Sequence, residues 1–168
     1  ATMMTTKQTA QAGRAGMMPK GWFSAYQITA VTKPQTAAIM ALIFFFSSDT
    51  ASASDAKSGV FVDLLLPFAA WLDADMLSFL IRKGAHFSIY ALLGICVYMA
   101  LFHAGKAKAA AAWIICALYA CSDELHQMMV MGRSAQLSDV ALDSLGALCG
   151  ILFCLWIIAW KRKRDRRA

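Results

Sequence analysis

The sequence predicts an all-α integral membrane bundle of about four transmembrane helices, with an interfacial or re-entrant helix between the first and second spans. The chain of 168 residues is 60% hydrophobic and only 15% charged, whereas a soluble domain carries roughly 25% charged residues. The mean hydropathy is +0.55, and the apolar residues form long runs. Together these observations indicate that lipid is the solvent of most of the surface.

The first apolar run follows a polar segment. Residues 1–33 show no apolar period, which is typical of a disordered cytoplasmic leader. The first span is expected from about Pro34 to Ser48. Because Ala51-Ser52-Ala53 follows this span, a cleaved signal peptide is an alternative interpretation of the same residues.

The segment 59–80 is apolar but repeatedly interrupted. Asp63, Pro67, Asp73 and Asp75 lie within it, and unpaired carboxylates are costly in the hydrocarbon region. The pattern therefore predicts a short amphipathic or re-entrant element in the membrane interface instead of a full span.

Three further apolar runs are long enough to cross a bilayer. They cover residues 84–103, 107–127 and 137–160, and a run of charges follows in residues 161–168. The expected organisation is therefore a leader, a membrane domain over residues 34–160 and a basic cytoplasmic tail.

The distribution of basic residues predicts the orientation. If both termini are cytoplasmic, the leader, the connector after residue 103 and the tail are inside, and only Lys57, Arg82, Lys83 and Arg133 remain outside. Positive charge prefers the cytoplasmic side, so we expect a multi-pass protein of the bacterial inner membrane with both ends inside. The tail is interpreted as a topology anchor and not as a nucleic-acid surface, because no folded basic domain accompanies it.

This topology brings scattered polar residues to the outer mouth of the bundle. They open the second span, close the third, form the outer turn and open the fourth. In chain order these residues are Lys83, His86, Asp123, Glu124, His126, Gln127, Arg133, Asp139 and Asp143.

Helical spacing places many of these residues on stripes. Asp139, Asp143, Gly146 and Gly150 share one face of the fourth span, while Lys83, His86, Tyr90 and Gly94 share one face of the second. We expect the stripes to face one another, because ionisable groups are expensive against lipid. The GxxxG pattern of Gly146 and Gly150 is most simply a helix-packing device.

At these residues the sequence resembles the VanZ-like family of small bacterial membrane proteins. The resemblance covers about residues 34–160 and includes the end of the first span, Ile43-Phe-Phe-Phe-Ser47-Ser48, which argues against signal cleavage. The family is named for a protein associated with low-level teicoplanin resistance, and the resemblance implies no agreed catalytic residues. Its main motifs are Arg82-Lys83-Gly-Ala-His86-Phe87, Tyr119-Ala-Cys-Ser122-Asp123-Glu124-Leu-His126-Gln127, Gly132-Arg133 and Asp139-Val-Ala-Leu-Asp143-Ser-Leu-Gly146.

The first hypothesis is a protein that binds or remodels an anionic membrane lipid or a lipid-linked envelope precursor. Lys83 and Arg133 would hold a phosphate, the four acids of the cluster would orient these cations, and the lipid tail would lie beside Gly146 and Gly150. The expected ligand-binding residues are Lys83, His86, Tyr90, Gln127, Arg133, Asp139 and Asp143.

Two alternatives remain open. In an intramembrane hydrolase or transferase, His126 would be the general base, oriented by Asp123 or Glu124. No cofactor is predicted; a divalent metal would use His86, His126 and one or two of Asp123, Glu124 and Asp143, but no established zinc spacing such as HExxH is present. In a non-catalytic subunit of an envelope machine, with partners that the sequence does not name, the polar cluster would only fix helix packing.

Overall fold

The computed structural model describes residues 20–68, 71–101 and 107–167. All regular secondary structure in the described part of the chain is helical, without strands, which confirms the predicted all-α class. Most of the predicted leader lies outside the described residues. The helices are α2 (Lys20–Ser47), α3 (Ala51–Leu65), α4 (Ala74–Ala100), α5 (Lys108–Gln127) and α6 (Leu137–Asp165), with a short 3-10 turn at Leu66–Phe68.

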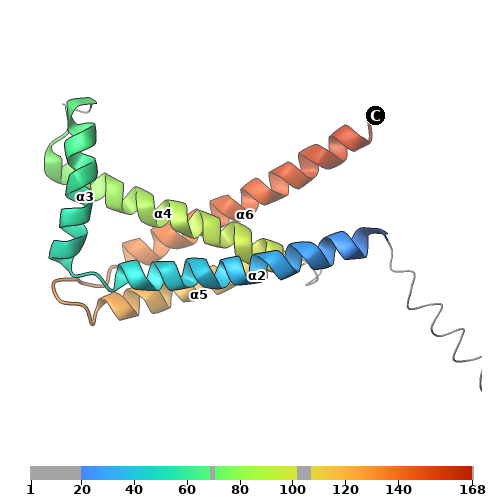
Figure 1. The fold of residues 1–168 in the computed structure, drawn as a ribbon, viewed down its shortest axis with the longest axis horizontal. Coiled ribbons are helices and arrows are strands. Elements are labelled where there is room, and N and C mark those ends of the chain that lie inside the picture. The colour runs from blue at the N-terminus through green and yellow to red at the C-terminus, as the bar shows by residue number, and fades with distance from the viewer. Residues whose placement is uncertain (1–19, 69–70, 102–106, 168) are drawn as a thin grey trace, which may run out of the picture.

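Four of the helices form the bundle, and α3 stands across one end of it (Figure 1). The C-terminal ends of α2 and α5 meet the N-terminal ends of α4 and α6 at this end, which we call the polar end of the bundle. Helices α4 and α6 cross and form the largest contact, while α2 and α5 pack along them. The arrangement brings residues from α2, α4, α5 and α6 into one region.

Two helices begin earlier than the sequence predicted. Helix α2 begins at Lys20, within the predicted leader, and Pro34 lies in its interior. Helix α4 begins at Ala74 because Asp73 caps it: the Asp73 carboxylate accepts a hydrogen bond of 2.6 Å from the backbone N–H of Met76. An acidic N-cap satisfies a free backbone donor and favours the positive end of the helix dipole. The acid that seemed to interrupt an apolar run therefore starts a helix.

The bounds predicted for the interfacial or re-entrant element, residues 59–80, do not match those of any single helix in the described structure. The described residues of this segment comprise the end of α3, the 3-10 turn and the beginning of α4. Helix α3 itself starts at Ala51, where the Thr50 side chain accepts a hydrogen bond of 3.3 Å from the backbone N–H of Ala53. Its Ser58 hydroxyl pairs with that of Ser78 on α4 at 2.8 Å, which joins the two helices.

Two described helices, α4 and α6, are each long and apolar enough to cross a membrane. The segments Thr32–Ser47 and Ser52–Phe68 meet the same criteria only as a pair bent by 104°, which would make a third span. Helix α5 does not meet these criteria; it carries Asp123, Glu124 and Gln127 near its end, and all three are buried. Two to three candidate spans are therefore found where the sequence predicted about four.

Glycines set the close approach of α4 and α6. A Cβ atom added to Gly94, Gly146 or Gly150 would collide with backbone atoms of the opposite helix, so only glycine permits this spacing. The predicted packing role of the two α6 glycines is therefore confirmed. The prediction that a lipid tail lies beside them is wrong, because the backbone of α4 at Phe87 and Ala91 occupies that space.

Large apolar side chains cover much of the outside of the described helices. Phe45, Leu64, Leu118 and Leu152 come from four different helices, and each is more than half exposed. A soluble monomer rarely exposes contiguous apolar surface on this scale. This distribution fits helices that face lipid.

Candidate functional site

Two successive ionic contacts join α4 to α6 at the polar end of the bundle. Lys83 pairs with Asp139, and each side chain is 25% exposed. One turn deeper, His86 Nδ1 lies 3.7 Å from Asp143 Oδ2. The polar stripes of α4 and α6 therefore face each other, as their spacing predicted.

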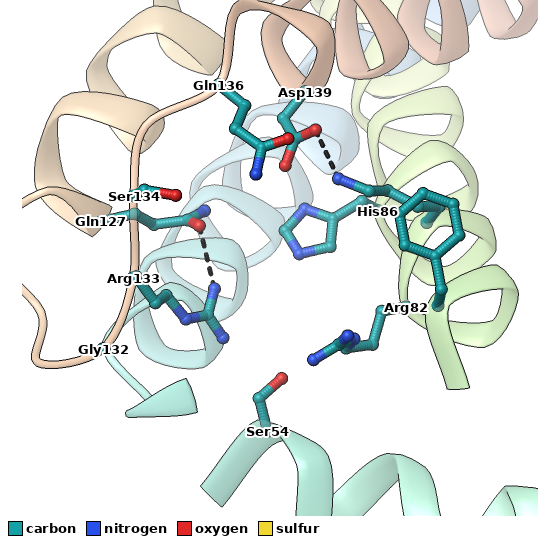
Figure 2. A pocket seen from close by; sticks show the side chains of 11 residues that line it. Ser54, Arg82, His86, Gln127, Gly132, Arg133, Ser134, Gln136 and Asp139 are labelled. Carbon is teal, nitrogen blue, oxygen red and sulfur yellow. Dashed lines mark hydrogen bonds and ion pairs between the residues drawn. The ribbon is translucent and has the colours of Figure 1, made fainter. Parts of the chain in front are cut away.

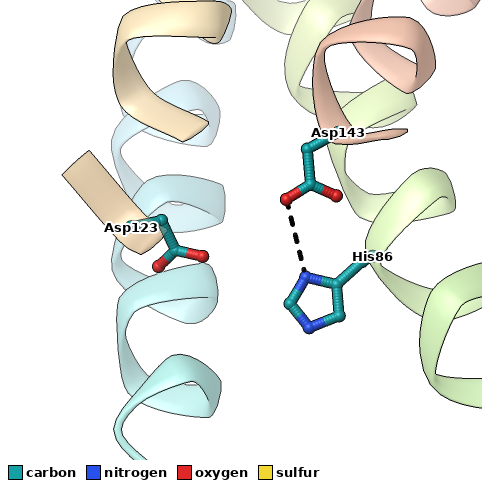
Figure 3. Close-up of side chains that lie close together, drawn as sticks. All are labelled: His86, Asp123 and Asp143. Carbon is teal, nitrogen blue, oxygen red and sulfur yellow. Dashed lines mark ion pairs between the residues drawn. The ribbon is translucent and has the colours of Figure 1, made fainter. Parts of the chain in front are cut away.

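Asp123 of α5 joins the inner of these two contacts. Figure 3 shows the carboxylates of Asp123 and Asp143 and the ring of His86 directed toward one another, from three different helices. One nitrogen or oxygen atom of each residue lies within 4.8 Å of the others. Both carboxylates are almost completely buried, with residue exposures of 4% and 3%. We call these three residues the His86 cluster.

Several buried polar atoms at this cluster have no hydrogen-bond partner. Among the described residues, they are Asp123 Oδ1, Asp143 Oδ1 and the hydroxyl of Tyr90. Tyr90 is fully buried and lies one turn further along α4 than His86, on the same helix face. Buried polar groups are nearly always satisfied in native proteins, so three orphaned atoms together need an explanation.

Gln127 connects the His86 cluster to the outer turn. Its side-chain amide donates to Asp123 Oδ2 at 3.1 Å and to Ser47 Oγ at 3.4 Å. Its carbonyl oxygen accepts a hydrogen bond of 2.9 Å from Arg133 Nη1. Gly132 precedes Arg133 and has a φ of 79°, which a side chain would disfavour at this sharp turn. The turn therefore positions the Arg133 side chain to donate to Gln127.

Glu124 and His126 have other contacts. Buried Glu124 accepts a hydrogen bond of 2.7 Å from the backbone N–H of Gln136, which ties the α5–α6 turn to α5. The ring of His126 stacks on Phe44 with 4.4 Å between centroids, and its Nε2 lies 3.1 Å from the Ser48 hydroxyl. The described structure thus places His126 against α2 and outside the His86 cluster.

A polar pocket of about 220 Å³ opens beside this cluster. In Figure 2, Arg82 and Arg133 extend from opposite sides toward the space above Ser54 of α3, and the ring of His86 lies behind them. Most of the predicted ligand-binding residues contribute to its wall. The lining residues with charged, imidazole or amide side chains are Arg82, Lys83, His86, Gln127, Arg133, Gln136 and Asp139.

A second, mainly apolar pocket of about 540 Å³ lies between α2, α3 and α4. Its apolar wall includes Ile43 and Phe46 of α2, Val60 of α3, and Ile81 and Ile89 of α4. The two pockets share four lining residues: Ser54, Arg82, His86 and Arg133. They therefore meet at the two arginines.

Two pocket residues, Arg82 and Ser54, were not predicted to belong to the site. Arg82 could have been predicted as a site residue, because it precedes His86 by four residues and residues at this spacing share a helix face. Ser54 had no such signal. It reaches the pocket because α3 folds against α4, where Asp55 also pairs with Arg82.

Comparisons with known proteins place the chain in one family. Among curated proteins and among solved structures no match was found. The family profile described as VanZ/LLP1 matches residues 35–159, which is most of the chain and includes every residue of the His86 cluster and both arginines of the pocket. The chain therefore belongs to the VanZ/LLP1 family.

Proposed function

We propose that this protein binds or processes an anionic lipid or a lipid-linked precursor of the cell envelope. The polar pocket receives the anionic headgroup, and the apolar pocket receives the hydrocarbon chain. The observation that carries the proposal is the meeting of the two pockets at Arg82, His86 and Arg133. An amphiphile needs such a site, with cationic donors at one end and an apolar wall at the other.

Arg133 is the strongest candidate for the headgroup contact. Among the described residues no carboxylate lies within ion-pair distance of it, and its Nη1 is bonded to the neutral amide of Gln127. Its remaining guanidinium donors are available, and their fork matches two oxygens of a phosphate. Arg82 faces the same space but pairs with Asp55, whose side chain is 57% exposed. A phosphate could displace this exposed carboxylate at little cost.

If the site also processes its ligand without a metal ion, His86 is better placed than His126 to act as the base. His86 lines both pockets and lies beside a buried carboxylate, Asp143. That arrangement is the one in which an acid orients an imidazole for proton transfer. The role predicted for Asp123 and Glu124 as partners of His126 draws no support from their contacts.

We further propose a location in the bacterial inner membrane, with four spans and both termini cytoplasmic. Helix α5 would be the additional span: its 20 residues correspond to about 30 Å of helix, and its acids are buried inside the bundle. The basic residues of the α6 end then lie inside, as the positive-inside rule requires.

A C-terminal fusion tests this orientation. A fluorescent protein that folds only in the cytoplasm is expected to be bright after residue 168, whereas a secreted phosphatase is expected to be inactive there. Fusions in the α5–α6 turn, after Ser134, should show the reverse pattern. A bright fluorescent fusion at both positions would contradict the proposed path of the chain.

Replacing Arg133 by alanine is expected to remove the bound lipid. Wild-type protein, solubilised gently and examined by native mass spectrometry, should retain an anionic or polyprenyl lipid. Arg133→Ala should retain at least tenfold less, since a charge-assisted bidentate contact contributes about 1.5–3 kcal/mol. The melting temperature should change little, because Arg133 lies in a partly exposed turn.

Arg162→Ala is the matched control. It removes the same side chain from the exposed far end of α6, so it changes net charge equally without touching either pocket. Equal lipid retention in wild type and Arg133→Ala would contradict the proposed headgroup site. Loss of lipid together with loss of the fold would instead favour a structural role for the polar cluster.

A further inference from the structure

Neither carboxylate of the His86 cluster pairs with a lysine or an arginine among the described residues. Asp123 and Asp143 are both more than nine-tenths buried, and each has one carboxylate oxygen without a partner. Lys83 is engaged by Asp139, and Arg133 is bonded to Gln127. Two buried carboxylates this close strongly repel each other unless a proton or a cation lies between them.

The composition and spacing of the cluster match a metal site. Imidazole nitrogen and carboxylate oxygen are common ligands of Zn²⁺, and bonds of about 2.0–2.2 Å in tetrahedral geometry place two of its ligand atoms about 3.3–3.6 Å apart. The three candidate atoms lie within 4.8 Å of one another, so side-chain movements of about 1 Å would close the site around an ion. The 3.7 Å between His86 Nδ1 and Asp143 Oδ2 is too long for a hydrogen bond but suits two ligands of one ion.

The hydroxyl of Tyr90 is an independent indication. Tyr90 has no exposed surface, and its hydroxyl has no hydrogen-bond partner among the described residues. It lies on the same face of α4 as His86, one turn further along the helix. A buried tyrosine normally finds a partner for its hydroxyl, and a ligand or water bound at the cluster would supply one.

We propose that His86, Asp123 and Asp143 bind a divalent transition-metal ion, with Zn²⁺ as the first candidate. Three protein ligands leave a coordination position open, which is the pattern of a catalytic and not a structural zinc site. Because His86 also lines the polar pocket, the ion would lie beside the space proposed for the headgroup. An oxygen of that headgroup, or a water molecule, would complete the coordination.

Sequence spacing does not reveal this site, because its ligands come singly from α4, α5 and α6. The expectation of no cofactor rested on the lack of a short motif such as HExxH. The structure brings the three residues together through the contact of the α4 and α6 stripes and the inward position of Asp123 on α5. The proposal does not depend on lipid binding.

Metal binding to the full-length chain in detergent tests the proposal. Protein freed of metal by a chelator, and then of the chelator, is titrated with Zn²⁺ and separately with Co²⁺. We expect about one tightly bound ion per chain by elemental analysis, with a visible Co²⁺ spectrum typical of four or five N and O ligands. Asp143→Asn and Asp123→Asn, which keep the side-chain shape, should each weaken binding at least tenfold, since even changes behind the ligands cost 10–100-fold.

Two matched variants provide the controls. Asp63→Asn removes an exposed acid of α3 that lines neither pocket, and His126→Asn removes the other described histidine of the polar end. Both should bind Zn²⁺ as the wild type does. Helicity and gel-filtration profiles show whether each variant is folded. If one of the aspartate variants does not fold, His86→Gln serves as another variant that removes a proposed ligand.

Two outcomes would overturn the proposal. If wild type binds no more Zn²⁺ than the ligand variants, the cluster is not a metal site. An intense sulfur-to-cobalt charge-transfer band would assign the metal to cysteines instead. Zn²⁺ binding is also measured on Arg133→Ala protein that has lost its lipid. Binding that persists there would support the metal site independently of the proposed lipid function.

Discussion

Replacing Gly150 by alanine is expected to destabilise the protein by about 3 kcal/mol, the upper end of what overpacking costs. The added Cβ would collide with the backbone carbonyl of Ala91 on α4. A side chain could rotate away from such a clash, but a backbone carbonyl within a helix cannot. Helices α4 and α6 would have to separate, and their ion pairs at the polar end would lengthen. The midpoint of denaturation in mixed detergent micelles measures the loss.

Gly84→Ala is the matched control for this variant. Gly84 also lies within a helix, but no atom is found within 4 Å of a Cβ added there. Alanine is the better helix former by about 1 kcal/mol, so this variant should be as stable as the wild type or more stable. If the two alanine variants denature at the same midpoint, the close approach of α4 and α6 is contradicted.

Replacing Lys83 by methionine is expected to cost about 2 kcal/mol of unfolding free energy. Removing one partner of a fully buried ion pair costs roughly 3–5 kcal/mol, because the other charge is left uncompensated. Lys83 and Asp139 are each 25% exposed, so water reduces this penalty. The Ser138 hydroxyl, 3.2 Å from Asp139 Oδ1, offers the remaining carboxylate only a weak contact.

The double variant Lys83→Met/Asp139→Asn separates the ion pair from simple packing. It removes both charges, so no carboxylate is left uncompensated, and its stability should recover by about 1–2 kcal/mol relative to Lys83→Met. Measurements on delipidated protein avoid any contribution from a bound headgroup. Additive losses in the two single variants would mean that the residues do not interact.

The sequence predicted that the polar stripes of α4 and α6 face each other, because each stripe depends only on the periodicity of its own helix. Residues three and four apart share a helix face whatever surrounds the helix, and charged residues near lipid have a strong preference for the bundle interior. Lys83, His86, Asp139 and Asp143 could therefore be assigned to one interface, and the two α6 glycines to its packing. The deficit of charged residues likewise identified a membrane protein without any tertiary information.

The roles of the two histidines at the polar end could not be assigned in this way. His126 and Asp123 are three residues apart, and their spacing is compatible with a shared face. Which side of α5 turns inward depends on its packing against α2, where Phe44 and Ser48 contact His126. The Asp123 side chain instead points toward His86. The two residues lie on different helices, so no spacing in the sequence predicts their contact.

The sequence by itself predicted that lipid surrounds most of the helices, that the fold is all-helical, and at which end of the bundle the polar residues gather. These properties follow from composition and from the repeat of a single helix, both of which are local. Only the tertiary structure decided that α3 folds back to complete two pockets and that three separate helices bring His86, Asp123 and Asp143 together. Those contacts depend on how each helix is rotated and where it ends, which is set by side chains distant in the chain.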